Sequence, residues 1–93
     1  MKQLTYKTTG TCAKYINIVL DENNTITSVE FLGGCHGNTQ GISKLVSGMN
    51  AVDVIKKLEG IRCGMKSTSC PDQLACALRE LTDYLIFTIY ETP

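Results

Sequence analysis

The 93-residue sequence has no excess of charge of either sign and no long apolar run. Nine Lys and Arg residues balance nine Asp and Glu residues, so the chain lacks a strong positive field that could hold a nucleic-acid backbone or an anionic membrane surface. No apolar run approaches the roughly 18 residues of a membrane span, and the N-terminal MKQLTYKTTG lacks the apolar centre of a signal peptide. These absences argue against nucleic-acid and membrane partners and predict a cytoplasmic protein.

The sequence also lacks the composition of a disordered chain. Hydrophobic residues make up 43% and charged residues 19%, which is ordinary for a globular protein. Because one hydrophobic core typically organises about 100 to 150 residues, we expect a single domain over residues 1–93. We find no internal repeat or linker that would divide it.

The first third of the chain has the two-residue hydrophobic period of β-strands. We predict strands over 2–8, 14–20 and 25–32, and the second of them has Ile16, Ile18 and Leu20 on one face. The polar segment 21–24 is typical of a turn, which predicts a β-hairpin between the last two strands.

From there the hydrophobic period becomes 3.6 residues, which indicates helices. We predict one helix that ends at Gly48, a second that is capped by Asn50 and a third that begins at Pro71. Their apolar stripes are Ile42, Leu45, Val46 and Met49; Ala51, Val54, Ile55 and Leu58; and Leu74, Leu78, Leu81, Leu85 and Ile89. Strands followed by helices predict an α+β domain, with an N-terminal antiparallel sheet of about three strands and three helices packed on one face.

Four of the five cysteines, Cys12, Cys35, Cys63 and Cys70, fall at the ends of predicted elements. Loops at such positions commonly hold ligands and nucleophiles, whereas buried structural cysteines lie within apolar stripes. An odd number of cysteines without an export signal argues against a disulfide framework. The spacing C-x22-C-x27-C-x6-C contains no C-x2-C pair, so only the fold can bring these residues together. A shared metal or redox site and unrelated buried thiols both remain open.

Other residues near the cysteines have weaker signals. Cys76 lies inside the third predicted helix but off its apolar stripe, and we expect a buried or half-buried packing residue. His36 adjoins Cys35, and we expect it to support a ligand or lie on the surface rather than bind a metal itself. Positive side chains at Lys14, Arg62 and Lys66 could offset the charge of clustered thiolates or simply be solvated.

The start of the third helix makes a specific prediction for Cys70. If Pro71 is the first helical residue, Cys70 is the N-cap, and its sulfur lies near the backbone N–H groups of Asp72 and Gln73. Those donors and the helix dipole would favour the thiolate.

The segment Thr68-Ser69-Cys70-Pro71-Asp72 spells the signature after which the TSCPD domain family is named, and the chain resembles small stand-alone members with four cysteines. The resemblance covers residues 10–12, 33–38, 60–64 and 68–77. TSCPD domains also occur at the C-terminal end of cobalamin-dependent ribonucleotide reductases, so the resemblance implies a relationship to those enzymes. Because 93 residues leave no room for the barrel that carries the radical chemistry, we expect no complete reductase.

A more distant likeness is to the U-type iron-sulfur scaffold proteins. Cys12, Cys35 and Cys70 occupy places similar to the scaffold's cysteines: before a hairpin, in a Gly-Cys turn before a helix, and at the opening of a late helix. The chain departs from that pattern because Cys12-Ala13-Lys14 stands where the scaffold has Cys-Gly-Asp, and because Cys63 has no counterpart. A fourth thiolate favours a closed, stable site over a labile one.

These observations together predict a metal-binding domain with the ligands Cys12, Cys35, Cys63 and Cys70. Four thiolates suit tetrahedral zinc best, and an iron-sulfur cluster is the alternative. The site would be structural or accessory to a partner enzyme, to which the domain docks or supplies thiols or metal; a small homo-oligomer is the other expected assembly. In the rival interpretation, Cys63 and Cys70 exchange reducing equivalents as a thiol-disulfide pair.

Overall fold

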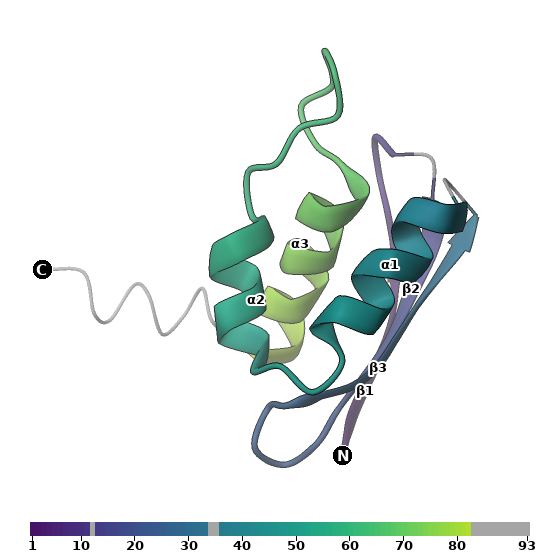
Figure 1. Cartoon of the computed structure of the whole chain (residues 1–93). Coiled ribbons are helices and arrows are strands. Elements are labelled where there is room, and N and C mark those ends of the chain that lie inside the picture. The colour runs from purple at the N-terminus through teal and green to yellow at the C-terminus, as the bar shows by residue number, and fades with distance from the viewer. Residues whose placement is uncertain (12, 34–35, 83–93) are drawn as a thin grey trace, which may run out of the picture.

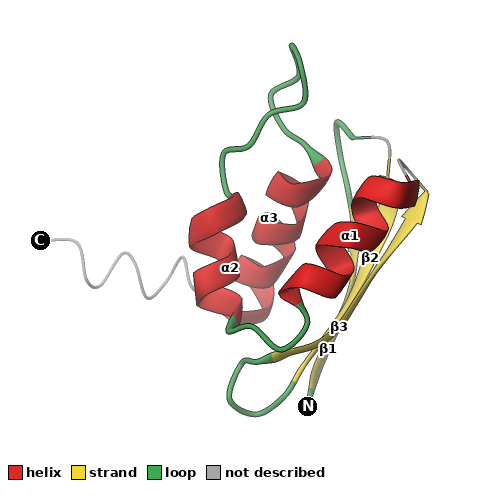
Figure 2. Cartoon of the chain, in the orientation of Figure 1, coloured by secondary structure: helices red, strands yellow, loops and turns green. Residues whose placement is uncertain are grey.

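The computed structural model consists of a three-stranded antiparallel sheet with three helices on one side of it (Figure 1). The structure describes residues 1–11, 13–33 and 36–82. In chain order the elements are β1 (Lys2–Lys7), β2 (Ala13–Leu20), β3 (Ile26–Gly33), α1 (His36–Val46), α2 (Ala51–Leu58) and α3 (Cys70–Thr82). Strands form one layer and helices the other (Figure 2), which confirms the predicted α+β class and its element order. None of the helices in the described ranges is long and apolar enough to cross a membrane.

The sheet is a meander in the order β1-β2-β3. Ile16, Ile18 and Leu20 of β2 are each 0% exposed, as their alternation predicts, while Tyr15 on the opposite face is 41% exposed. The hairpin turn forms because the Asp21 carboxylate accepts hydrogen bonds of 2.8 Å from two backbone N–H groups, at residues 23 and 25. One face of the sheet is therefore buried in the core, and none of the three described helices covers the other face.

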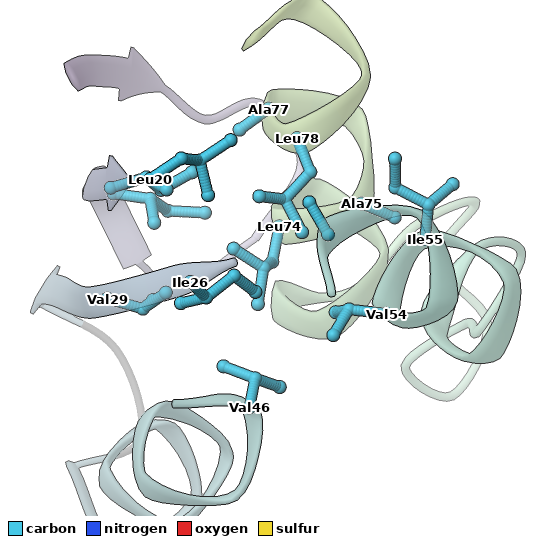
Figure 3. Close-up of a cluster of buried hydrophobic side chains, with 13 residues drawn as sticks. Leu20, Ile26, Val29, Val46, Val54, Ile55, Leu74, Ala75, Ala77 and Leu78 are labelled. Atoms are coloured by element: carbon cyan, nitrogen blue, oxygen red, sulfur yellow. The ribbon is translucent and has the colours of Figure 1, made fainter. Parts of the chain in front are cut away.

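The core lies between this sheet face and the helices. α1 packs against β3, α3 packs against β1 and β2, and α2 packs against α3. Leu74 extends from α3 towards Ile26 of β3, and Val54 of α2 lies nearby (Figure 3). The fully buried large side chains are Ile16, Ile18, Leu20, Ile26, Ile55, Leu74, Leu78 and Val54. The predicted stripes of α2 and α3 supply most of the helical part of this core.

The N-cap of α2 is the residue that the sequence predicts, but one member of the predicted stripe of α1, Leu45, is not in the core. The Asn50 side chain accepts a hydrogen bond of 2.9 Å from the backbone N–H of Val52, so it is the N-cap of α2. Leu45 of α1 is 77% exposed, and its assignment to the core was wrong. The buried face of α1 is centred on Thr39 and Val46, which are seven residues apart, and Leu45 lies about 100° around the helix from Val46. The predicted stripe positions at 85 and 89 lie outside the described residues.

Candidate metal centre

A cavity of about 170 Å³ lies where the loops that carry the predicted ligands meet. Its walls come from the loop before β2, the first turn of α1, the loop between α2 and α3, and the first turn of α3. They are lined by Thr11, Asn38, Thr39, Ile61, Arg62, Cys63, Lys66, Ser69, Cys70 and Pro71. Cys63 and Cys70 belong to the last two of these segments.

The structure brings two of the four predicted ligands to this cavity, Cys63 and Cys70. Cys63 is exposed on the loop, Cys70 is half-buried as the first residue of α3, and both are free thiols. Cys12 and Cys35 lie outside the described residues. Their neighbours in the sequence line the cavity: Thr11 immediately precedes Cys12, and Asn38 and Thr39 follow Cys35 within four positions. Among the described residues alone, no group of three or more His, Cys, Asp or Glu side chains could hold a metal ion.

Backbone hydrogen bonds give the loop of Cys63 a defined shape. The N–H of Cys63 donates to the carbonyl of Thr68 at 3.1 Å, and the N–H of Lys66 donates to the carbonyl of Cys63 at 3.0 Å. Ser69 Oγ donates to the carbonyl of Ile61 at 2.6 Å, which fastens the start of the loop to the start of α3. Cys63 is therefore held close to α3 although its side chain is open to solvent.

Ser69, and not Cys70, is the N-cap of α3. Its Oγ accepts a hydrogen bond of 3.2 Å from the N–H of Asp72, and its carbonyl accepts one of 2.8 Å from the N–H of Gln73. The predicted capping role of Cys70 was wrong because Pro71 is the second helical residue rather than the first, which moves the cap one residue back. Since Ser69 caps the helix, the Cys70 thiol is not needed for that role and lines the cavity instead.

The Asp72 carboxylate joins three parts of the chain near the cavity. One oxygen accepts a hydrogen bond of 2.7 Å from the N–H of Gly60, at the end of α2, and the other accepts one of 2.5 Å from the Thr68 hydroxyl. Hydrogen bonds to an ionised carboxylate are stronger than those between neutral groups. Asp72 thus ties both ends of the loop that carries Cys63 to the first turn of α3.

Gln73 extends the same network to the loop before Cys12. The side chain is only 6% exposed; its Nε2 donates to the Thr68 hydroxyl at 3.0 Å, and its Oε1 accepts from the N–H of Thr9 at 3.1 Å. Gly10 packs so closely that a Cβ atom there would lie 3.0 Å from Thr68 Cγ2, and its φ of +71° also favours glycine. Sequence reasoning missed this role of Gln73; the only signal was a polar residue beside the apolar stripe of α3.

The charged side chains that line the cavity are both positive. Arg62 and Lys66 lie on its wall, and none of the Asp and Glu residues that the structure describes does. Lys14, the third predicted cation, is exposed on β2 and does not line the cavity. The first turns of two helices also contribute to the wall, and helix N-termini favour negative charge. A cavity with this lining suits a negatively charged group.

The family model of the TSCPD domain matches residues 2–82. The chain belongs to the TSCPD domain family. In this TSCPD domain the signature is a structural unit, because Thr68, Ser69 and Asp72 hold the loops while Cys70 faces the cavity. Searches of curated proteins and of solved structures found no match, so the likeness to U-type scaffold proteins stays a prediction.

We expect the Asp72 network to orient the loops of the TSCPD domain. Asp72→Ala leaves the Gly60 N–H and the Thr68 hydroxyl without their partner, which should cost about 1 to 3 kcal/mol of unfolding free energy in denaturant titrations. If the proposal below is correct, metal affinity measured by chelator competition should also fall by about 10- to 100-fold.

Asp53→Ala is the matched control, because Asp53 is also the third residue of its helix but is exposed. It loses only an interaction with the helix dipole, which is worth less than about 1 kcal/mol. Equal losses of stability in the two variants would mean that Asp72 does not hold the loops together.

Cys76 is half-buried and does not line the cavity, as its position off the stripe predicts. Burial raises the pKa of the Cys76 thiol, and the Asp72 carboxylate raises it further. The pKa of Tyr6 is also raised, first by its own burial and then by Cys76. The two groups therefore face a common environment between β1 and α3 that disfavours negative charge.

The raised pKa predicts how Cys76 responds to pH. The folded state favours the neutral thiol, so its contribution to stability is complete below the unfolded-state pKa and is lost as the pH rises through the higher folded-state pKa. In metal-free protein at pH 8, we expect iodoacetamide to modify Cys76 more slowly than the exposed Cys63. Peptide mass spectrometry measures both rates, and equal rates would contradict the assignment.

Proposed function

We propose that this TSCPD domain binds a metal through Cys12, Cys35, Cys63 and Cys70, with zinc as the first candidate and an iron-sulfur cluster as the alternative. The observation that supports the proposal is a cavity lined by Cys63 and Cys70, whose wall also includes Thr11, which precedes Cys12 in the sequence, and Asn38 and Thr39, which follow Cys35 within four positions. Four thiolates satisfy the tetrahedral preference of zinc, and the same ligand set suits a cluster.

The charges around the cavity support a metal with sulfur ligands. Zinc with four thiolates carries a net charge of about −2, and an iron-sulfur cluster with four thiolates is also anionic, so positive surroundings favour either site. Arg62, Lys66 and the first turns of α1 and α3 supply them. A bound metal would cross-link segments far apart in a small domain and so stabilise it considerably.

The position of Cys63 supports an accessory role beside a partner enzyme. Residues 61–67 are all exposed, so of the two proposed ligands that the structure describes, Cys63 is the more accessible to a partner. The domain would dock to an enzyme through this side, or supply it with thiols or metal. No residue of the described segments is assigned a catalytic role.

Metal analysis of the protein, expressed without added metal and purified both aerobically and anaerobically, tests the proposal. A zinc site gives a colourless protein with about one zinc per chain, whereas a cluster gives a brown protein that holds iron and sulfide and bleaches in air. Absence of both metals from both preparations would overturn the proposal.

A second candidate function is thiol-disulfide exchange, which one observation favours: Cys63 and Cys70 are free thiols on the wall of the same cavity. Their oxidation to a disulfide would release two protons and pass two electrons to an oxidised partner disulfide, which becomes two thiols. Mass spectrometry of metal-free protein equilibrated with oxidised or reduced thioredoxin tests this reaction. A disulfide of Cys63 with Cys70 that forms and is reduced reversibly would favour it, and its failure to form would exclude it.

A further inference from the structure

One edge of the sheet is only partly paired within the described residues. β3 has β2 on one side and no strand on the other. At the start of β3, Ile26 uses that free edge: its N–H donates to the carbonyl of Met49 at 2.9 Å, and its carbonyl accepts from the N–H of Gly48 at 2.8 Å. Beyond Ile26, no backbone hydrogen bond from the described residues reaches this edge from outside the sheet.

The register shows which backbone groups remain at the edge. Ile26, Val29 and Phe31 pair with Leu20, Ile18 and Ile16, which alternate along β2. Antiparallel pairs alternate between hydrogen-bonded and non-hydrogen-bonded, and Ile26 directs its N–H and carbonyl away from β2. Leu20 pairs with Ile26 and Val19 pairs with Ser28, so Thr27 is an extra residue of β3 at this point. As in a β-bulge, it restores the alternation, so Val29 and Phe31 also direct their N–H and carbonyl groups outwards.

A cleft of about 400 Å³ runs along this part of the edge. Its strand wall is the five consecutive residues Thr27 to Phe31, and consecutive residues of both faces can line one cleft only along the strand's edge. Its other wall is one face of α1, which runs alongside β3 (Figure 1), with Thr39, Gln40, Ser43, Lys44 and Ser47. The strand wall is about 16 Å long, the length of five extended residues.

We propose that this edge cleft binds an extended peptide segment of a partner protein, which pairs with β3 as a fourth strand. The outward N–H and carbonyl groups of Val29 and Phe31 can pair with the backbone of an extended peptide, in which every second residue directs its own N–H and carbonyl towards β3. The wall of hydroxyl, amide and ammonium groups on α1 suits polar side chains of that strand, including an acidic one opposite Lys44.

The edge cleft also adjoins the proposed metal centre, because Thr39 lines both cavities. A partner held by the edge cleft would therefore lie beside the cavity of Cys63 and Cys70. The peptide site does not depend on a bound metal, and its test is performed on metal-free and metal-loaded protein alike.

Random octapeptides displayed on phage, selected against the full chain, provide the probe, and enriched sequences are then synthesised for titration. We expect N-methylation of alternate peptide amides to weaken binding about tenfold or more, because each methyl group removes a backbone hydrogen bond to the edge. We also expect bound peptide to slow hydrogen exchange of the Val29 and Phe31 amides, read by NMR. Failure to enrich any peptide, or equal binding of the N-methylated forms, would overturn the proposal.

Two variants test whether the peptide binds in the edge cleft. Ser43→Trp fills the cleft from the α1 side and should weaken binding about tenfold or more, while Thr5→Trp, on the uncovered face of β1, should not change it. Circular dichroism checks that both variants fold. Peptides that bind Ser43→Trp as well as they bind the parent would contradict the site. A dimer in solution whose Val29 and Phe31 amides are protected without peptide would assign the edge to a second copy and overturn the proposal.

Discussion

Replacement of Cys63 or Cys70 with alanine should empty the proposed metal site, whereas Cys76→Ala should leave it full. Cys63 and Cys70 line the cavity, while Cys76 lies on another face of α3. Structural zinc contributes apparent binding energies of about 10 to 16 kcal/mol in zinc-finger peptides, and that energy is coupled to folding. We therefore expect the first two variants to lose bound metal and much of their thermal stability together.

The same result is expected for Cys12→Ala and Cys35→Ala, which complete the proposed ligand set. Metal content is measured by elemental analysis and thermal stability by calorimetry, each with and without chelator. The parent and Cys76→Ala should both lose stability on chelation, but the four ligand variants should be insensitive to it. Undisturbed metal in Cys63→Ala, or metal loss in Cys76→Ala, would disprove this ligand set.

Local patterns were sufficient to predict the elements of this domain. The alternation of Ile16, Ile18 and Leu20 identified β2, and Asn50 identified the start of α2, because each depends on contacts between residues near in sequence. Leu45 was misassigned because the exposed position of a helical residue depends on where the neighbouring layers lie. Periodicity alone does not contain that information.

The hydrogen bonds of the candidate site could not be predicted from local patterns, because they join residues far apart in the sequence. Cysteines at element ends indicated a site, but the hydrogen bonds from Thr9 to Gln73 and from Gly60 to Asp72 join residues 64 and 12 positions apart. No local pattern predicts such pairs. The prediction of Cys70 as N-cap failed for a local reason, since Ser69 is a better capping residue and stands immediately before it.

The hydrogen bonds explain what the residues around Cys70 contribute. Ser69 caps α3 and holds the carbonyl of Ile61, and Asp72 holds Gly60 and Thr68. Short polar side chains hold the loops in place, and the Cys70 thiol takes no part in these hydrogen bonds. A site built this way is expected to be sensitive to Asp72 as well as to the cysteines.

The core that supports these loops should be most sensitive at Leu74. Leu74 is 0% exposed and lies one residue after Gln73, so it anchors the first turns of α3 against β3 and α2. Leu74→Ala removes most of a buried side chain and leaves a cavity, which costs about 2 to 5 kcal/mol in protein cores. In a domain of this size each 1 kcal/mol lowers Tm by about 4 to 8 °C.

Leu45→Ala is the matched control, because it makes the same chemical change on a side chain that is 77% exposed. Surface substitutions usually change stability by less than about 0.5 kcal/mol, so the two variants should differ several-fold in denaturant unfolding. Leu74→Ala retains every proposed ligand, and its folded fraction should still bind metal with the stoichiometry of the parent. Loss of stability with metal retained distinguishes damage to the core from damage to the ligand set, and equal stability of the two leucine variants would contradict the packing of α3 described above.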